Sequence, residues 1–339
     1  MVEDDINSQW IKDAHKTVSH LFKHNSWIYV IDLLLTYTTG IFLLYINYTA
    51  SDLILKLACF GGVVFCFYRV FSFIHEISHF KGSSLQGFKW LWMGLAGIPF
   101  LLPYSLYTDH VTHHSQKNYG TKTDGEFLPF TSMKRSARYL FLMHGLFNPF
   151  LLVFRYGILT PLGYINRQWR EQIYRSASAA VIDPSYKRLF KTITDFTVFK
   201  RHECICFLYL IGVTTLSAFQ YIPLIIILYY YLIVALASTL NAFRTAIAHV
   251  YHNPTSNKMT FESQFFDSIN ITSWSFIHSL WAPVGLRFHA LHHLFPSMPY
   301  HHLGKAHQLL IKTLSENSPY HTASRSSAFQ SICCYLNGK

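Results

Sequence analysis

Four long runs of apolar residues, separated by polar segments, dominate the pattern of the chain. They cover residues 27–48, 53–73, 203–219 and 222–240. A helix needs roughly 20 mostly apolar residues to cross the hydrocarbon core of a bilayer, and each run is close to that length. Only a short turn separates the two runs of each pair, which favours antiparallel helical hairpins. The pattern therefore predicts an all-α integral membrane protein with four transmembrane helices in two hairpins.

Two further apolar stretches, residues 90–107 and 139–164, complicate this count because both contain prolines. If the first stretch crossed the bilayer, the first two histidine clusters described below would lie on opposite sides of it. If only the second stretch crossed, the third cluster would be separated from the others. We therefore expect interfacial or re-entrant helices under a cytoplasmic helical cap, which consists of residues 74–202 and 241–320.

The two ends of the chain differ from this central domain, which we place at residues 27–320. In residues 1–26, apolar side chains recur with helical spacing among lysines and predict a helix on the membrane surface: Trp10, Ile11, Ala14, Val18, Leu21 and Phe22. Residues 321–339 form a polar C-terminal tail, to which we assign no chemistry.

Composition and charge agree with a membrane protein. Charged residues make up only 13% of the chain, against about 25% in ordinary soluble domains. The net charge is +11, but no short basic run or nucleic-acid motif occurs, so nucleic acid is not an expected partner. Of the 28 Lys and Arg residues, 16 lie between the hairpins and none in the hairpin turns. By the positive-inside rule, both termini face the cytoplasm, at the inner membrane if the protein is bacterial, with membrane lipids as partners.

Three histidine clusters carry the candidate chemistry. On a helix, positions i, i+3 and i+4 share a face, so each cluster can point two or three imidazoles at one place. Neutral imidazole suits iron, zinc, copper or nickel, and eight imidazoles are too many for one ion. The eight histidines are His75 and His79, then His110, His113 and His114, then His289, His292 and His293.

The positions of further residues along the chain suggest a ninth imidazole ligand and several groups that could support the ligands. Asn241, Thr245 and His249 are spaced by four at the end of the last apolar run, so a continuous helix would put them on one face. Metal-bound histidines usually donate their second ring N–H to an acceptor. The residues that could contact and orient the metal-binding histidines in this way are Asp109, Asp124, Glu126, Asn241, Thr245 and Asp267.

The residue types favour two iron ions over other metals. Structural zinc sites usually close with four ligands, and catalytic zinc keeps three protein ligands and a water. The carboxylate-rich di-iron design needs two Glu-x-x-His units, and only residues 76–79 form one. A histidine-rich diiron centre at a membrane surface can use O2 against an unactivated C–H bond of a lipid chain. No dinucleotide-binding or cytochrome b5 motif occurs, so we expect a separate electron donor, such as a ferredoxin or a cytochrome b5 type protein.

Two rival readings use the same residues. Residues 75–79 also match the H-E-x-x-H helix of zinc proteases, in which Glu76 would be the general base. That reading leaves the second and third clusters without a role. A metal-binding membrane protein without catalysis is the other rival. It is disfavoured because the apolar runs lack the carboxylates typical of an ion path: they contain Asp32, and Glu203 at the start of the third run.

At this point the chain resembles the membrane fatty acid desaturase family, over about residues 60–320. That family has three histidine boxes in this order, and its bacterial members share further motifs with this chain: residues 97–99, 120–121, 124–126, 241–249 and 289–301. The resemblance implies a mushroom-shaped fold, two irons and a narrow apolar tunnel for an acyl chain. It also implies that His249 joins the metal ligands. In acyl-CoA members an Asn precedes that histidine by four residues, whereas Thr245 stands here and Asn241 is the alternative.

We therefore predict O2-dependent introduction of a double bond into a fatty acyl lipid. The alternative on the same scaffold is a lipid or carotenoid hydroxylase or ketolase, because the outcome depends on sub-ångström placement of the C–H bond. The short first box, H-x(3)-H, argues mildly against an acyl-CoA substrate. The acyl carrier, the chain length and the position of reaction stay open.

Overall fold

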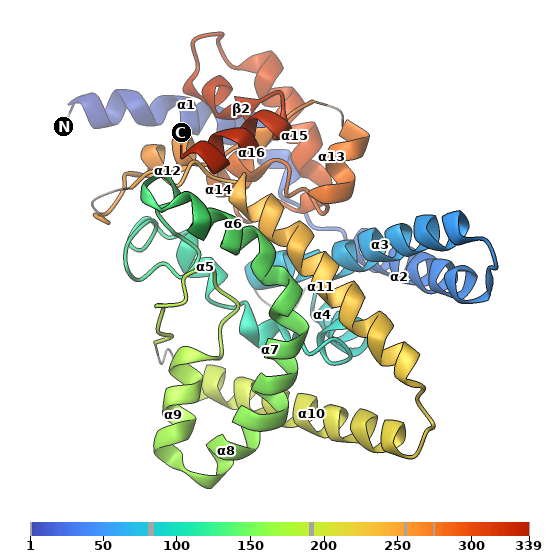
Figure 1. Cartoon of the computed structure of the whole chain (residues 1–339). Coiled ribbons are helices and arrows are strands. Elements are labelled where there is room, and N and C mark those ends of the chain that lie inside the picture. The colour runs from blue at the N-terminus through green and yellow to red at the C-terminus, as the bar shows by residue number, and fades with distance from the viewer. Residues whose placement is uncertain (1, 81–84, 190–192, 254–255, 274, 339) are drawn as a thin grey trace. The chain divides into compact units, whose positions relative to one another are not determined.

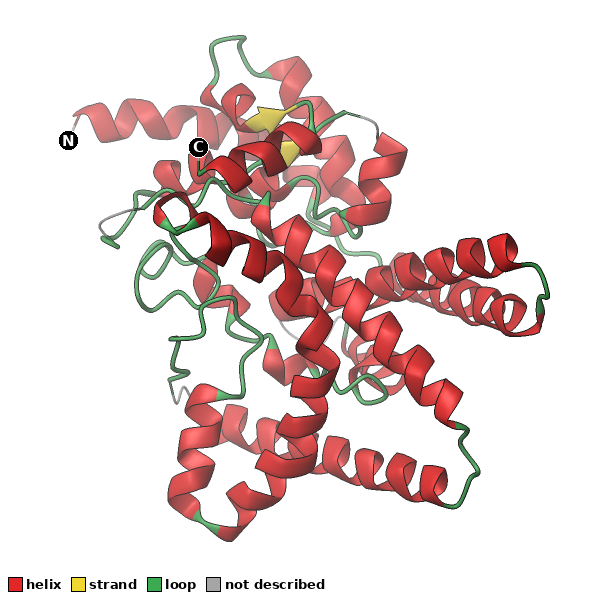
Figure 2. Cartoon of the chain, viewed as in Figure 1, coloured by secondary structure: helices red, strands yellow, loops and turns green. Residues whose placement is uncertain are grey.

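The computed structural model describes residues 2–80, 85–189, 193–253, 256–273 and 275–338. Parts of the expected cap and both chain ends, at residues 1, 81–84, 190–192, 254–255, 274 and 339, lie outside the described residues. Helices make up most of the described residues, and these also contain two strands of two residues each (Figure 2). The predicted all-α class is confirmed. The chain, which Figure 1 colours by residue number, divides into two compact units.

Unit 2 comprises residues 29–111 and 143–242 and contains most of the long apolar helices. Its elements are α2 (Ser26–Thr49), α3 (Leu53–His79), α4 (Gln86–Trp92), the π-helix η2 (Met93–Gly97), η3 (Tyr104–Leu106), η5 (His144–Phe147), α7 (Asn148–Phe154), the π-helix η6 (Arg155–Leu159), α8 (Thr160–Ile165), α9 (Arg167–Ser176), α10 (Ile193–Ala218) and α11 (Leu224–Ala246).

Unit 1 comprises residues 1–28, 112–142 and 243–339. Its elements are α1 (Val2–Val18), η1 (Ser19–Leu21), η4 (Phe130–Ser132), α6 (Arg135–Met143), α12 (Phe261–Asp267), β1 (Asn270–Ile271), α13 (Ser275–Trp281), α14 (His289–Leu294), α15 (Tyr300–Thr313), η7 (Pro319–Ala323), β2 (Ser324–Arg325) and α16 (Ala328–Asn337). The division along the sequence falls within the short helix α5 (His110–His113), after Val111. In unit 1, β1 pairs with β2 in parallel.

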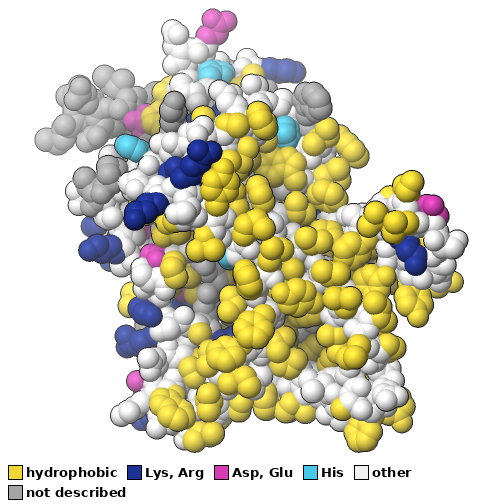
Figure 3. Space-filling view, viewed as in Figure 1, with side chains coloured by type: hydrophobic (Ala, Val, Ile, Leu, Met, Phe, Trp, Pro, Cys, Tyr) yellow, Lys and Arg dark blue, Asp and Glu magenta, His cyan; other side chains and the backbone are white. Residues whose placement is uncertain are grey.

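Among the described residues, four helical segments are long and apolar enough to cross a membrane. Three of them, α2, α3 and α11, match predicted runs, and the fourth is the combined segment Arg135–Ile165. The predicted third span, residues 203–219 on α10, is not among the four. The first half of α10 carries three charged residues, Lys200, Arg201 and Glu203. Hydrophobic side chains cover the face of unit 2 that is formed by α7, α10 and α11 (Figure 3). This surface suits contact with lipid.

The segment Arg135–Ile165 differs from the broken stretch that its prolines led us to expect. Pro149 and Pro161 lie in the first turns of α7 and α8, where a backbone N–H has no partner to lose. Short 3-10 and π turns, η5 and η6, join the helices into one run. By contrast, the stretch 90–107 is broken: α4 continues into η2, which ends at Gly97, and Leu101 adopts a positive φ of 55°.

Polar contacts hold the first hairpin together inside its apolar surroundings. Asp52 caps α3 by accepting a hydrogen bond from the backbone N–H of Leu55 at 2.7 Å. Asp32, a carboxylate within the first apolar run, accepts a hydrogen bond from Nε of Arg69 at 2.9 Å and forms an ion pair with it. Asp32 therefore has a structural role in the α2–α3 hairpin.

The apolar face of the N-terminal helix is covered by protein. Trp10, Ala14 and Val18 are buried in one core with residues of α14 and α15, and Nε1 of Trp10 donates to Glu262 at 3.3 Å. From the sequence, we expected this face to contact a membrane. Because α14 carries the third histidine cluster, the packing of α1 instead supports the segment on which that cluster lies.

Candidate metal centre

Four buried imidazoles meet inside unit 1. His113 ends α5, His249 follows the last turn of α11, and His289 and His293 lie one helical turn apart on α14. Nε2 of His249 is 2.8 Å from Nε2 of His289 and 3.2 Å from Nε2 of His113. Nε2 of His293 lies 3.2 Å from Nε2 of His289. Ring nitrogens from three separate segments thus converge on one small volume.

The local backbone explains how His249 reaches this cluster. Helix α11 ends at Ala246, so residues 241, 245 and 249 do not continue on one helical face as expected. Instead, residues 248 and 250 pair with the chain after α12: the N–H of Val250 donates to Asp267 O at 2.7 Å, and that of Ile269 donates to Ala248 O at 2.9 Å. This pairing holds His249 against α12.

The second ring nitrogen of His113 faces a carboxylate. Nδ1 of His113 is 2.9 Å from Oδ2 of Asp124, and Asp124 also accepts the backbone N–H groups of Gly120 and Glu126 at 3.0 Å each. Burial opposes a charge on His113, but the carboxylate of Asp124, together with those of Glu126 and Asp267, outweighs this effect and raises the pKa of that imidazole. The contact orients the ring and leaves Nε2 directed at the cluster.

The other members of the cluster also have polar neighbours. Nδ1 of His249 is 2.8 Å from Oη of Tyr119 and 3.2 Å from Oγ of Ser268. Nδ1 of His293 lies 3.2 Å from Nε2 of Gln264. Tyr119, Ser268 and Gln264 were not predicted from the sequence, because none of the three has a spacing that signals a metal site.

Burial keeps two of these imidazoles neutral. Burial, and to a smaller extent repulsion from neighbouring histidines and from Arg244, lowers the pKa of His249 and of His289 well below the ordinary value. A neutral imidazole has a free lone pair on one ring nitrogen, which is the form that binds a metal.

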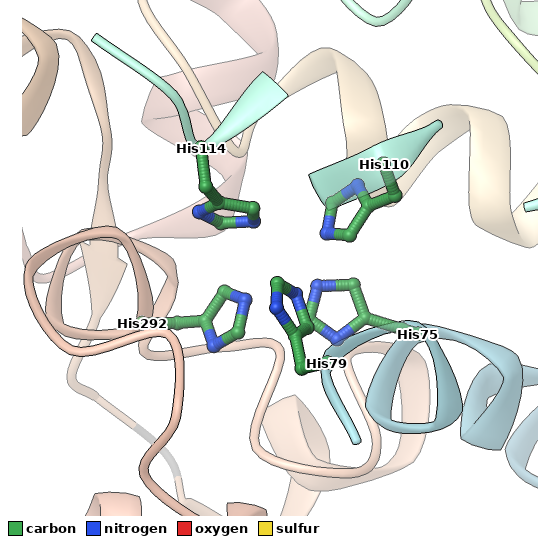
Figure 4. A group of neighbouring side chains, drawn as sticks. All are labelled: His75, His79, His110, His114 and His292. Carbon is green, nitrogen blue, oxygen red and sulfur yellow. The ribbon is translucent and has the colours of Figure 1, made fainter. Parts of the chain in front are cut away.

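The remaining box histidines form a trio in unit 2 and a pair in unit 1, drawn as sticks in Figure 4. His75 and His79 project from α3 and His110 from the start of α5. The ring centroid of His110 lies 4.5 Å from that of His75 and 5.0 Å from that of His79. In unit 1, the rings of His114 and His292 are 4.7 Å apart.

Glu76 lies outside the trio, although it stands between two of its members in sequence. Its Oε2 accepts a hydrogen bond from Oη of Tyr29 at 2.8 Å, and both side chains are buried. Its other carboxylate oxygen is 3.9 Å from Nδ1 of His75. The carboxylate thus joins α3 to α2, which differs from the position that a zinc protease requires of its general base.

The other predicted supporting groups have different surroundings. Oδ2 of Asp109 accepts hydrogen bonds from Nε of Arg188 at 2.8 Å and from Oη of Tyr186 at 3.0 Å. The backbone N–H of Glu126 contacts Asp124. Asn241 is exposed, and Thr245 accepts a hydrogen bond through its backbone oxygen from Tyr251. Asp267 is buried 3.7 Å from Nδ1 of His249.

The four nitrogens in unit 1 fit a metal ion. Nitrogens bound to one metal at about 2.1 Å lie roughly 3 Å apart when they are adjacent ligands, and the observed separations are 2.8–3.2 Å. The donor set consists of imidazoles alone, which suits iron, zinc, copper or nickel and excludes a calcium or magnesium site.

Comparison with known proteins identifies the family of this histidine-rich architecture. The protein-family model "Fatty acid desaturase" matches residues 53–324. The chain belongs to the fatty acid desaturase family. This confirms the resemblance inferred from the histidine boxes, and membership in the family implies an oxygen-dependent oxidoreductase.

One curated relative within this family extends over almost the whole chain. It is the "Ceramide hydroxylase" of Caulobacter vibrioides (strain NA1000 / CB15N), which is 34% identical over 95% of this chain and 91% of its own length. No solved structure gives a significant match. Fatty acid desaturase family proteins are known for diiron sites, and this chain contains groups of histidines that could hold a metal ion.

Proposed function

We propose that the protein is a membrane diiron enzyme that uses O2 to hydroxylate an alkyl chain of a ceramide-like lipid. The observation that carries the metal assignment is the convergence of four buried imidazole nitrogens within 4.8 Å of one another. The reaction is supported by the similarity to a ceramide hydroxylase over 95% of this chain. The substrate class comes from that relative and from the exposed apolar surface of unit 2.

We assign the two irons to two ligand sets. His113, His249, His289 and His293 would hold one iron. From the histidine boxes of the sequence, we assign the remaining five histidines to the other iron: His75, His79, His110, His114 and His292. This uses all nine predicted histidines and explains why the chain has three boxes, since no single ion accepts nine imidazoles.

When bound, the two irons would activate O2 and transfer electrons to it. The residues of the chain have different tasks. Asp124 holds the Nδ1 proton of His113, and Gln264 contacts Nδ1 of His293, so both rings keep their orientation. The burial of the four imidazoles in unit 1 excludes bulk water from their lone pairs.

Desaturation of a fatty acyl chain is the second candidate, and the name of the matching family model favours it. Both reactions begin with the same C–H bond. They differ in whether oxygen is transferred to the carbon or a second hydrogen is removed from its neighbour. The acyl carrier stays open in both cases. In either case we propose a separate electron donor protein and a cytoplasmic location for both termini.

Expression in a host without such an enzyme, followed by mass spectrometry of its lipids, tests the reaction. We expect a new hydroxylated sphingolipid with the wild-type protein and none with His292→Ala. The matched control is His20→Ala, because His20 is exposed and lies outside the clusters. A new double bond would replace the first candidate by the second. Full activity of His292→Ala would contradict the ligand assignment.

A further inference from the structure

Tyr119 occupies a position between a carboxylate and a proposed metal ligand. Its side chain is fully buried. Its Oη lies 2.6 Å from Oδ2 of Asp267 and 2.8 Å from Nδ1 of His249. The direct distance from Asp267 to the same ring nitrogen is 3.7 Å, beyond a hydrogen bond. The hydroxyl group therefore bridges two groups that do not reach each other.

The number of hydrogens fixes the direction of both contacts. A tyrosine hydroxyl has one hydrogen to donate and lone pairs with which it accepts. A carboxylate accepts only, so the hydroxyl donates to Asp267, whose other oxygen accepts the backbone N–H of His252 at 3.0 Å. The hydroxyl must then accept from His249, which places the ring proton on Nδ1. The lone pair of His249 is left on Nε2, the atom that faces His289 and His113.

The backbone holds Tyr119 in this position independently of the hydroxyl. Gly120 has a φ of 68°, and a Cβ atom there would lie 2.9 Å from Nδ2 of Asn253. Asn253 donates to Gly120 O at 3.0 Å, and Gly120 N donates to Asp124 at 3.0 Å. One turn thus carries both Asp124, which contacts His113, and Tyr119, which contacts His249.

We propose that Tyr119 is a positioning residue that connects Asp267 to His249 and sets the tautomer and ring orientation of that ligand. This inference rests on the proposed function, because it takes His249 as a metal ligand. His113 contacts the carboxylate of Asp124 directly, whereas the hydroxyl group of Tyr119 lies between His249 and the carboxylate of Asp267. Ser268 also contacts Nδ1 of His249 at 3.2 Å, so loss of the Tyr119 hydroxyl weakens the support of the ring without removing all of it.

The test compares two buried tyrosines that pack against His249. Tyr119→Phe removes the bridging hydroxyl, and Tyr251→Phe is the matched control. The Tyr251 ring centroid lies 5.1 Å from that of His249, but its hydroxyl donates to the backbone of Thr245. The full-length proteins are purified in detergent, and Fe²⁺ affinity is measured by competition with a chelator. The absorption spectrum of the Co²⁺-loaded proteins is recorded as a second readout.

We expect Tyr119→Phe to weaken Fe²⁺ binding by about 10–100-fold, the usual effect of losing a group that orients a ligand, and to change the Co²⁺ spectrum. Tyr251→Phe should leave both within about threefold of wild type. Adding Asp267→Asn to Tyr119→Phe should weaken binding little further, because the two groups act in series. Equal behaviour of the two phenylalanine variants would overturn the inference while the proposed function stands. A wild-type protein that binds no Fe²⁺ would overturn both.

Discussion

Oδ2 of Asp124 lies 2.9 Å from Nδ1 of His113, and both side chains are buried. The contact holds a proton on Nδ1 and leaves Nε2 for the cluster. Asp124→Asn keeps the shape of the side chain but removes the charge that stabilises this arrangement. We predict a loss of iron affinity and of lipid oxidation of about 10–100-fold.

Iron per chain and the rate of product formation measure this effect in the purified protein. The control is Glu316→Gln, which removes a carboxylate at an exposed position of the C-terminal region. The account of Asp124 would be wrong if both variants kept wild-type iron content and rate.

A substitution of Glu76 distinguishes an oxygenase function from a zinc protease function. Because its carboxylate accepts a hydrogen bond from Tyr29, Glu76→Gln preserves an acceptor at that place. We predict that the variant keeps measurable lipid oxidation, whereas His79→Ala loses it. In a protease, Glu76 would activate the metal-bound water, so Glu76→Gln would be inactive with its metal still bound. Product analysis of the two variants side by side decides between these outcomes.

A buried ion network around Glu203 stabilises the first half of α10. Glu203 accepts hydrogen bonds from Nη2 of Arg155 at 2.8 Å and from Nη2 of Arg170 at 2.7 Å. Glu203→Ala would leave these cations without their carboxylate, which costs about 3–5 kcal/mol for a buried pair. Glu171→Ala removes the partner of Arg167 in an exposed pair, and it should cost less than about 0.5 kcal/mol. Unfolding of the two variants in detergent measures the difference, and similar stabilities would contradict the structural role of Glu203.

His307 should make folding stability depend on pH. Burial, with smaller effects of Arg287 and His321, lowers the pKa of His307 from 6.5 to about 4, and its Nδ1 lies 2.8 Å from Oη of Tyr320. Between these two values the unfolded chain binds a proton that the folded chain does not. The stability is therefore complete above pH 6.5 and falls as the pH decreases toward 4, by at most about 1.4 kcal/mol per pH unit.

The variant His307→Gln removes this titration and keeps a polar side chain near Tyr320. Between pH 7 and pH 5, the wild-type protein should lose up to about 2 kcal/mol more unfolding free energy than the variant does. His20→Gln, at an exposed position, should behave as wild type. A variant that loses as much stability as wild type would show that His307 does not titrate as described.

The sequence predicted the fold class because apolar length and helical periodicity are local properties. It did not predict the continuity of Arg135–Ile165, because the effect of Pro149 and Pro161 depends on their exact place in a helical turn. It also could not tell whether the apolar face of α1 would contact lipid or protein. That choice depends on residues nearly 300 positions away, in α14 and α15.

In the candidate site, too, the features that depend on local sequence were predicted and those that depend on distant residues were not. The spacing within each box predicted which histidines share a helix face, and His289 and His293 do so on α14. The prediction that Thr245 and His249 share one helix face was wrong, because α11 ends at Ala246. Tyr119 could not be recognised, since its importance lies in two contacts across 130 and 148 residues of sequence.

The most direct test of the central claim follows the oxygen atom itself. Purified, iron-loaded protein is supplied with a ceramide, an electron donor system and isotopically labelled O2, and the lipid product is examined by mass spectrometry. The account predicts a hydroxylated ceramide that carries the label, formed by the wild-type protein and by His20→Ala but not by His292→Ala. A hydroxyl group without the label, or an unchanged lipid in the presence of two bound irons and reductant, would contradict it.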